Sequence, residues 1–453
     1  MRYSLKQIAE VVSGQLYGDE NVIIEGASSD SRNITSSQIF VPFIGEKVDG
    51  HKFVKEVLDK GVVASFWQKD ESLPRPIGNI IVVDDVLKAI QKLAAFHRRN
   101  KDIPFIGITG SSGKTSTKDM IASMLSAKYR VYKTAGNHNN KIGVPLTLLN
   151  MDDDAQIAVI EMGIDDIGIM DLLTEMVRPD YTVITSIAPA HIQQFKTVDK
   201  IVEQKCLINR LLPKNGKCFY NKECYGVENK LIEMGLKDQM ASFGFSDDCS
   251  LQATSYSLIN KSSCFKVKQY PDKEFRIPVL GQYQVADALS AILIGRELNF
   301  SYEDIQSGFD KIMITPRRMQ FKNIKDCTII DDSYNSNPSS LTSSLSTFVE
   351  YDDKENKVVV IGDMLELGED SSKLHASISE KVDFSKFNKI YLIGKEMKHL
   401  SEALNEKHIE NKWFIDWQTS LTEVKKEIKK ENIVFFKASN GMDFSGLITA
   451  LED

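Results

Sequence analysis

The amino-acid sequence predicts an α/β protein with three domains. The chain has 453 residues, more than one hydrophobic core usually holds. From residue 105 onward, continuous apolar runs of parallel-strand type alternate with helical stretches, and a mixed segment of short strands and amphipathic helices precedes them. We therefore expect a small mixed α/β N-terminal domain (1–100), a central domain of P-loop type with a parallel sheet (101–314), and a C-terminal Rossmann-like α/β domain (315–453).

The expected strands follow one another along the chain as short apolar runs bounded by polar turns. They cover residues 38–43, 79–85, 105–110, 155–163, 180–187, 327–334, 357–364, 389–395 and 432–439. Residues 198–212 and 280–299 have helical spacing. The basic, proline-containing segment "HRRNKDIP" (97–104) is typical of a linker, and a second boundary is expected within 311–320.

The composition excludes several classes of function. The net charge is −7 and there is no basic patch with interleaved aromatic residues, so we expect no nucleic-acid partner. No apolar run approaches the roughly 20 residues that cross a bilayer, and the N-terminus lacks signal-peptide features, so we expect no membrane insertion. Six scattered cysteines without a Cys-x-x-Cys pair indicate neither a zinc site nor a disulfide framework. We therefore expect a cytoplasmic location.

The segment "FIGITGSSGKTSTKDMIASML" (105–125) predicts a strand, a Gly/Ser loop and a helix. Strict Walker A spacing has glycine where Ile108 stands, but the physical logic of residues 110–115 survives this change. Glycines let backbone N–H groups approach phosphate oxygens, the helix N-terminus favours anions, and Lys114 adds a positive charge. Thr115 is placed to coordinate Mg²⁺. A ligand-free turn is the alternative, but a Lys-Thr pair in register after an apolar strand favours an ATPase-type nucleotide site.

Three further polar groups follow the loop along the chain. Glu161 ends an expected strand and is a fair Mg²⁺ ligand, although such a residue is more often an acid at a helix N-terminus. His191 follows the next strand, and a lone histidine is usually structural or solvated. Both follow parallel strands of the loop domain, so they belong to the sheet edge where ligands bind. Lys205 lies in a helical stretch, where the plain interpretation is a solvated lysine.

At this point the motifs resemble the Mur ligase family. The resemblance rests on "TGSSGKTSTKD", "EMG", "APAH" followed by Lys205, and above all "TAGNHNNKIGVPLTLL" (134–149). Similar stretches run through the whole chain: "SDSRNITSSQIFVPFIGEKVDGHKFV" (29–54), "DDSYNSNP" (331–338), "GDMLELGEDSSKLH" (362–375) and "KASNGM" (437–442). The first of these is similar to the family's uridine-nucleotide-binding domain, and the other three to its C-terminal domain.

The resemblance implies an amide ligase of peptidoglycan synthesis that uses ATP. The expected substrates are UDP-N-acetylmuramoyl-tripeptide (UDP-MurNAc-tripeptide) and D-alanyl-D-alanine (D-Ala-D-Ala), and we expect a monomer. ATP would phosphorylate the terminal carboxylate of the tripeptide, and the amine of the dipeptide would attack the acyl phosphate. A carboxylate is a poor electrophile at neutral pH, so the protein's task is to position the groups and to neutralise phosphate charge.

The resemblance also implies residue roles at the nucleotide. The expected catalytic residues are Lys114, His191, Lys205 and Arg318, and the expected ATP-binding residues are Gly110, Ser111, Ser112, Gly113, Lys114, Thr115, Ser116, Asp287, Arg318 and Asp332. Two Mg²⁺ ions would be held by Thr115, Glu161, His191 and Lys205. Lys205 aligns with a lysine that family members carbamylate, which turns a cation into a carboxylate-like ligand. Without the family, Arg318 beside Arg317 would be read as an ordinary surface charge.

The expected substrate-binding residues belong to three separate stretches. Ser31 and Arg32 stand where the family holds the uridine diphosphate end. The muramoyl-peptide end is expected at Asn137, Asn139 and Asn140, and the incoming dipeptide near Asn335 and Asn337. The first three asparagines lie in a glycine-containing turn, where they could equally satisfy their own backbone.

Several positions depart from the family pattern. Tyr283, Gln284 and Asp287 replace the usual His, Asn and Asn, and the last of these usually faces the adenine. An ionised aspartate accepts hydrogen bonds but cannot donate them, so adenine recognition could weaken or shift. Elsewhere Leu207 replaces a common glutamate, Ile44 a lysine and Ala438 a glycine.

Two alternatives remain open at this stage. A divergent ligase of the same fold would join another carboxylate to another amine, although the uridine-binding stretch at 29–54 speaks against it. A regulatory P-loop switch would bind nucleotide without forming an amide. The absence of an Asp-ended strand after the loop, and the two further domains with polar turns, speak against a switch.

Overall fold

The computed structural model describes residues 1–45, 48–69, 72–188, 192–351 and 356–452. The described chain forms two compact units. The first comprises Met1–Thr109, Lys128–Val183 and Gln204–Cys218, and the second Gly110–Ala127, Ile184–Glu203 and Phe219–Asp453. The middle of the chain is therefore shared between the units, and the helix after the phosphate loop belongs to the second.

The N-terminal part of the first unit is a small mixed sheet with three helices. The strand order is β2-β7-β6-β5-β4, in which only the β2–β7 pair is antiparallel. A separate antiparallel pair joins β1 to β3. The bounds are β1 (Arg2–Ser4), α1 (Leu5–Val12), β2 (Gln15–Tyr17), β3 (Ile23–Glu25), β4 (Ala27–Ser28), β5 (Ile39–Phe40), η1 (Gly50–Phe53), α2 (Val54–Asp59), β6 (Ala64–Gln68), β7 (Ile80–Val83) and α3 (Val86–Arg99).

The rest of the first unit carries three parallel strands in the order β9-β10-β8. Their bounds are β8 (Phe105–Thr109), β9 (Val131–Lys133) and β10 (Ile157–Glu161), and helices α5 (Gly143–Leu149) and α6 (Ile169–Val177) follow β9 and β10. Every residue of β8 and β10 is buried, as expected for strands covered on both faces. The polar Glu161 stands at the carboxyl end of β10, where parallel sheets bind ligands.

The second unit begins with the phosphate loop and helix α4 (Lys114–Leu125). Helices α10 (Gln282–Glu297) and α11 (Tyr302–Phe309) pack on α4 so closely that a Cβ on Gly308 would lie 2.4 Å from the Met124 Cα. Strands β13 (Met240–Gly244) and β14 (Leu251–Ile259) are parallel, and β15 (Ser262–Val267) and β16 (Tyr270–Ile277) extend them antiparallel. The second unit also contains α7 (Ile192–Phe195) and α9 (Val227–Glu233). The short turn η2 (Leu207–Asn209) belongs to the first unit. The bounds of the units fall within β11 (Tyr181–Ile184), α8 (Val198–Cys206) and β12 (Lys217–Asn221).

The C-terminal part of the second unit is a six-stranded sheet in the order β17-β18-β22-β19-β20-β21. Only β17–β18 is antiparallel. The strands are β17 (Gln320–Ile324), β18 (Cys327–Asp331), β19 (Asn356–Gly362), β20 (Lys389–Ile393), β21 (Lys412–Phe414) and β22 (Asn432–Lys437). The helices are α12 (Pro338–Glu350), η3 (Gly368–Asp370), α13 (Ser371–Ala376), α14 (Ile378–Lys381), η4 (Phe384–Lys386), α15 (Met397–Glu406), α16 (Trp417–Lys425), η5 (Asn440–Met442) and α17 (Phe444–Glu452).

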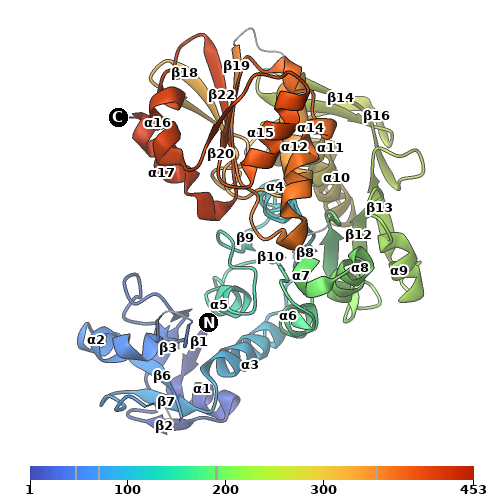
Figure 1. Ribbon diagram of the computed structural model, residues 1–453. Helices are drawn as coiled ribbons and strands as arrows, with labels where there is room; N and C mark the ends of the chain where they lie inside the picture. The colour runs from blue at the N-terminus through green and yellow to red at the C-terminus, as the bar shows by residue number, and fades with distance from the viewer. Residues whose placement is uncertain (46–47, 70–71, 189–191, 352–355, 453) are drawn as a thin grey trace. The chain divides into compact units, whose positions relative to one another are not determined.

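Helices cover both faces of this sheet, with α12 and α15 on one side and α16 and α17 on the other (Figure 1). Successive residues of β19 feed the two cores in turn: Val359 and Ile361 pack with α12 and α15, while Val358 and Val360 pack with α16 and α17. This alternation explains why the strand is a continuous apolar run in the sequence. The expected α/β fold class is confirmed.

Two expectations about local structure need correction. The basic segment 97–104 is not a linker throughout, because its first three residues form the last turn of α3. Basic side chains there favour the helix C-terminus through the helix dipole. The helical stretch expected over 198–212 ends at Cys206 and continues as the short turn η2.

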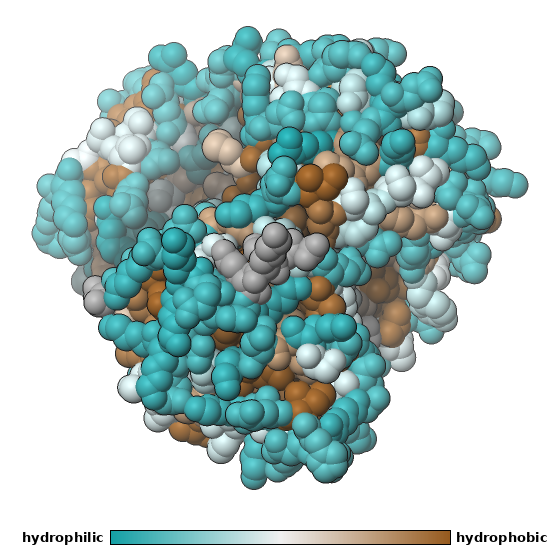
Figure 2. Space-filling view, turned by 90° about the horizontal axis from the view of Figure 1, so that it is seen from above, coloured by the Kyte–Doolittle hydropathy of each residue, from teal (hydrophilic) through white to brown (hydrophobic). Residues whose placement is uncertain are grey.

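The surface and the thiols fit the composition. The face seen in Figure 2 is mainly hydrophilic, and its apolar residues form small separate groups. Among the described residues, no helix combines the length and apolar character that a membrane crossing needs.

All six cysteines are buried and free. Burial raises the thiol pKa of Cys218 and Cys224 to about 12 and that of Cys249 to about 11.

Candidate nucleotide site at the phosphate loop

The phosphate loop makes two close approaches that only glycine allows. Gly110 has φ 157°, and a Cβ there would lie 2.0 Å from the Thr185 Oγ1. Gly113 has φ 83°, a conformation that L-residues avoid, and a Cβ there would lie 2.8 Å from Oδ1 of Asp287. The two glycines predicted from the loop pattern are therefore required by the shape of the loop.

The segment after β11 holds the loop from one side. The Ser111 N–H donates to the Ser186 carbonyl at 2.8 Å, and the Ser112 N–H donates to the Ser186 Oγ at 2.8 Å. The Thr185 hydroxyl donates to the Ser112 carbonyl at 2.5 Å, and the Ala188 N–H donates to the Ser111 Oγ at 3.0 Å. This segment was expected to supply a histidine, but His191 lies outside the described residues. The contribution of 185–188 to the loop was not predicted.

The Lys114 side chain folds back over the loop. Its Nζ donates to the Gly110 carbonyl at 2.8 Å and lies 3.5 Å from the Ser111 carbonyl. The ammonium group therefore stands over the loop at the start of α4, where the helix dipole also favours an anion. Thr115 and Ser116, the next two residues expected to bind ATP, are both buried in the first turn of α4.

Two side chains of the C-terminal segment reach the phosphate loop. The guanidinium of Arg318 donates to the Thr115 Oγ1 at 3.0 Å and lies 4.2 Å from the ring centre of Tyr334. Asn337 donates to the Ser112 Oγ at 3.1 Å, while its own Oδ1 caps α12 by accepting from the Ser340 N–H at 2.9 Å. Asn337, which was expected near the dipeptide, is therefore brought to the loop itself.

The two neighbouring arginines have different environments. Arg317 donates to the Ser445 Oγ at 2.6 Å and to the Asn440 Oδ1 at 3.2 Å, near α17. Arg318 turns the other way, onto Thr115. The plain interpretation of Arg318 as a surface charge like Arg317 is therefore wrong.

Asp332 is tied into the protein by both carboxylate oxygens. Its Oδ2 lies 2.6 Å from the Lys437 Nζ and accepts from the Ser344 hydroxyl at 2.7 Å. Its Oδ1 accepts from the Met319 N–H at 3.1 Å. In this structure Asp332 fixes the backbone next to Arg318. Lys437 and Ser344 were not predicted, although the "KASNGM" motif contains the lysine.

Asp287 lies on α10, buried against Gly113 of the loop. Burial raises the pKa of its carboxyl to about 8, and the positive charge of Arg318 opposes this shift only in part. At neutral pH the group is therefore a neutral acid that carries both a donor O–H and an acceptor C=O. The limit stated for an ionised aspartate does not apply to this form, which offers the same two hydrogen-bonding functions as an asparagine.

Four buried polar atoms close to the loop have no hydrogen-bond partner among the described residues. One is on α4, two are on α10 and one is on the arginine of the C-terminal segment: Thr117 Oγ1, Gln284 Oε1, Asp287 Oδ2 and Arg318 Nε. Such groups are rare in folded proteins because each costs about 1–3 kcal/mol when it is desolvated without a partner. The loop region therefore fits a polar ligand that would satisfy them, such as the base and phosphates of a nucleotide.

Glu161 and the asparagine-rich turn meet within the first unit. Asn139 donates to Oε1 of Glu161 at 2.6 Å, and the Glu161 side chain is buried. Asn140 instead accepts from the backbone of Ile142 and Gly143 at 3.1 and 2.8 Å, as a turn-forming residue does. Asn137 is exposed. The three asparagines thus differ: one orients the carboxylate, one forms the turn and one faces solvent.

Lys205 is only 4% exposed on the last turn of α8. The interpretation as a solvated helix lysine is therefore wrong. Lysine side chains are seldom buried this deeply in folded proteins. No cluster of three or more His, Cys, Asp or Glu side chains that could bind a metal is found in the described part of the chain, which omits His191.

The remaining expected residues form separate local structures. Arg32 donates from Nε to Oδ1 of Asp30 at 2.9 Å, and these contacts hold the pKa of that carboxyl at about 2. Ser31 lies beside it, half-buried. Asn335 is exposed, and its carbonyl accepts from Lys437 at 3.1 Å. Asp30 was not predicted, although it stands in the quoted "SDSR" stretch.

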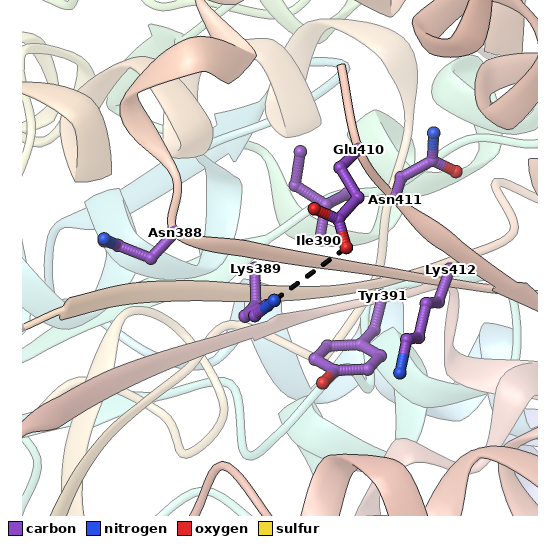
Figure 3. Close-up of a pocket in the computed structure, with 7 residues that line it drawn as sticks. All are labelled: Asn388, Lys389, Ile390, Tyr391, Glu410, Asn411 and Lys412. Atoms are coloured by element: carbon purple, nitrogen blue, oxygen red, sulfur yellow. Dashed lines mark ion pairs between the residues drawn. The ribbon is translucent and has the colours of Figure 1, made fainter. Parts of the chain in front are cut away.

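A small pocket elsewhere in the second unit has no relation to these residues. It is formed by 388–391 and 410–412, where Lys389 and Glu410 make an ion pair at 3.9 Å (Figure 3). Its volume is about 10 Å³, enough for one water molecule at most. It offers no room for a substrate.

The fold and the loop define a class of α/β proteins that bind a nucleotide at the start of a helix. Three family descriptions match the chain: Mur ligase family, catalytic domain, over residues 23–98; Mur ligase middle domain, over 108–295; and Mur ligase, glutamate ligase domain, over 317–440. UDP-N-acetylmuramoyl-tripeptide--D-alanyl-D-alanine ligase of Bacillus subtilis (strain 168) is 34% identical over 459 residues, which cover all of this chain and 98% of that protein.

Solved structures agree with this similarity. A crystal structure of MurF from Acinetobacter baumannii superposes with a TM-score of 0.87 at 27% identity, covering 100% of this chain and 99% of that one. A structure of MurF ligase from Thermotoga maritima in complex with ADP has the same fold, with a TM-score of 0.80 at 24% identity, over 94% of this chain and 97% of that one. The chain belongs to the Mur ligase family, and it is an ATP-dependent ligase.

The raised pKa of Asp287 leads to a prediction about stability. The folded protein binds the carboxyl proton more tightly than the unfolded chain, whose ordinary pKa is 3.8. The stability of the wild type should therefore fall as the pH rises from about 4 to about 8 through this group. Asp287→Asn removes the titration, so the Tm of the variant minus that of the wild type should increase over this window and level off above pH 8.

The matched control for this prediction is Asp326→Asn, since Asp326 is exposed. Its Tm difference from the wild type should stay flat with pH in the same thermal unfolding series. A flat difference for Asp287→Asn as well would mean that the buried carboxyl is ionised at neutral pH.

Proposed function

We propose that this protein joins D-Ala-D-Ala to UDP-MurNAc-tripeptide at the expense of ATP, in peptidoglycan synthesis. The observation that carries the proposal is that the similarity to the B. subtilis ligase of this name covers the whole chain. The loop geometry supports it, because Lys114 and Arg318 both stand at the start of α4. The products are UDP-MurNAc-pentapeptide, ADP and phosphate.

The proposed reaction has two steps. The terminal carboxylate of the tripeptide attacks the γ-phosphorus of ATP, which releases ADP and leaves an acyl phosphate. The free amine of D-Ala-D-Ala then attacks the acyl carbon, phosphate leaves with the bonding electron pair, and the amine loses a proton as the amide forms. The protein aligns the reactants and places positive charge at the phosphoryl group.

At the nucleotide, each assignment has its own support. Lys114 neutralises the β- and γ-phosphates from its position over the loop. Arg318 acts on the γ-phosphate, and Gly110, Ser111, Ser112, Gly113, Thr115 and Ser116 form the cradle. The neutral carboxyl of Asp287 makes the hydrogen bonds to the adenine that asparagine makes in other members. Asp332 acts near the nucleotide by fixing the segment that carries Arg318.

Two Mg²⁺ ions belong to the proposed active state, held by Thr115, Glu161, His191 and carbamylated Lys205. Mg²⁺ takes a few hard oxygen ligands from the protein and others from substrate phosphates, whose charge it offsets. The hydroxyl of Thr115 and the buried carboxylate of Glu161 fit this chemistry, and Asn139 orients the carboxylate. A protonated lysine cannot ligate a cation, whereas a carbamate can, so the proposed ligand is the carbamylated form of this buried lysine.

The proposed substrate contacts and functional domains are those that the similarity to Mur ligases implies. Ser31 and Arg32 bind the uridine diphosphate end, residues 137–140 bind the muramoyl-peptide end through their asparagines, and Asn335 and Asn337 lie near the dipeptide. The chain divides into functional domains 1–100, 101–314 and 315–453, in line with the family matches over 23–98, 108–295 and 317–440. The enzyme acts as a monomer in the cytoplasm.

The decisive experiment is phosphate release by the purified protein with ATP and Mg²⁺ while the acceptor pair is varied. We expect release that requires both UDP-MurNAc-tripeptide and D-Ala-D-Ala. Release with neither, or with another carboxylate and amine only, would show a divergent ligase. In that case Tyr283, Gln284 and Asp287 are the first positions to examine for its specificity.

Lys114→Ala should abolish ligation and leave binding of the UDP-linked substrate intact. The lost ammonium group acts on phosphate, whereas the uridine-binding residues belong to the N-terminal segment. Calorimetric titration with UDP-MurNAc-tripeptide, next to a phosphate-release assay, measures the two effects separately. Loss of both activities together would indicate misfolding or a wrongly assigned loop.

Lys205→Ala should be nearly inactive, because it removes the carbamate. Small carboxylic acids such as acetate should restore part of the activity by supplying a carboxylate at the vacated position. Phosphate release measured against acetate concentration checks this, with Lys200→Ala as control, since Lys200 lies on the same helix in a partly exposed ion pair with Glu203. An inactive variant that no acid rescues would argue against carbamylation.

A further inference from the structure

Asp119 is a buried carboxylate of α4 that has no role in the site described above. It is only 1% exposed and accepts two hydrogen bonds on Oδ2, both from Thr315. The Thr315 N–H lies at 2.8 Å and its hydroxyl at 2.7 Å. The other oxygen, Oδ1, lies 3.6 Å from the Nζ of Lys118, which is equally buried. A charged acceptor with two well-placed donors is a strong attachment.

The partner of Asp119 begins the segment that carries Arg318. We call residues 315–319 the anchor segment. At its start Thr315 is bound to Asp119, and three residues later Arg318 is bound to Thr115. Thr115 and Asp119 are four residues apart on α4, so they share one face of the helix, one turn from each other. The anchor segment is therefore fixed to the same helix face at two points.

The backbone of the anchor segment is held in an unfavourable conformation. Arg317 has φ 64° and Met319 has φ 49°, so both neighbours of Arg318 are left-handed without being glycine. Non-glycine residues keep this conformation only where the surrounding structure holds them in it. The Arg317 carbonyl accepts from the Tyr334 N–H at 3.1 Å, and the Met319 N–H donates to Asp332. These contacts fix the far end of the segment, and Asp119 fixes the near end.

We propose that Asp119 is a positioning residue for the ligase reaction. By holding Thr315 on α4, it keeps the anchor segment in the conformation that sets the Arg318 guanidinium against Thr115. This inference rests on the proposed function only for the role of Arg318 in phosphoryl transfer; the attachment itself is a property of the fold. Asp119 acts through Arg318 and makes no contact of its own with the reacting atoms.

A double-mutant cycle tests this coupling. Thr315→Val keeps the shape of the side chain and removes one of the two hydrogen bonds to Asp119, whereas Thr315→Ser keeps the hydroxyl and is the matched control. We expect Thr315→Val to lower kcat roughly tenfold with little change in the KM for ATP, and Thr315→Ser to stay within about twofold of the wild type. Asp119→Ala removes both bonds and should cost more, provided that it folds.

Repeating Thr315→Val in the Arg318→Ala variant shows whether its effect passes through Arg318 or reflects a general loss of stability. Arg318→Ala should lower kcat by about a hundredfold or more. In that background Thr315→Val should have no further effect beyond about twofold, because the group that it misplaces is gone. Equal losses from Thr315→Val in both backgrounds would overturn the proposal, since they would reflect a structural effect that does not pass through Arg318.

Limited proteolysis tests the attachment without using catalysis. Trypsin can cut after Arg317 and Arg318, so release of the anchor segment should speed cleavage there in Thr315→Val and Asp119→Ala but not in Thr315→Ser. Fragment masses identify the cut. Unchanged cleavage would overturn the attachment. A wild type that releases no phosphate with the two substrates would contradict the proposed function, whereas the cleavage pattern would still judge the attachment.

Discussion

The phosphate loop depends on two places where the chain leaves no room for a Cβ atom. At Gly110 the backbone lies against the Thr185 hydroxyl, and at Gly113 it lies against the Asp287 carboxyl. Because of these close approaches, residues 185–188 hold the loop by hydrogen bonds on one side and α10 packs against it on the other. Because the loop is fixed in this way, Lys114, Arg318 and Asn337 all contact residues whose positions are set. Arg318 and Asn337 come from a segment some two hundred residues further along the chain.

The buried polar atoms around this loop give the departures from the family pattern a physical meaning. A carboxyl that keeps its proton at neutral pH can replace an asparagine, since both offer one donor and one acceptor. Gln284 lies three residues earlier on α10, and its buried Oε1 has no hydrogen-bond partner in the part of the chain that the structure describes. The substituted positions thus keep hydrogen-bonding capacity toward a ligand. The difference is that the hydrogen-bonding capacity of a carboxyl depends on pH, whereas that of an amide does not.

Much of this molecule could be predicted from its sequence, and the parts that could not have two physical causes. Buried parallel strands such as β10 and β19 are continuous apolar runs, and the loop has a local spacing, so both were found. The antiparallel extension β14–β16 was missed because its strands mix buried and exposed residues without a strong pattern. Asp119, Ser344 and Lys437 were missed because their partners lie far away in sequence, and a single sequence carries no signal for a contact of that kind.

The burial of all six thiols has a practical consequence for experiments on this enzyme. A thiol reacts as the thiolate, and the raised pKa values of Cys218, Cys224 and Cys249 leave almost none of it at neutral pH. Alkylating dyes and mild oxidants should therefore react only slowly with the cysteines of the native protein. Two cysteines introduced on exposed loops would react much faster than the native thiols, so a pair of fluorescent or spin labels could report a distance within the working enzyme while its natural cysteines stay in place.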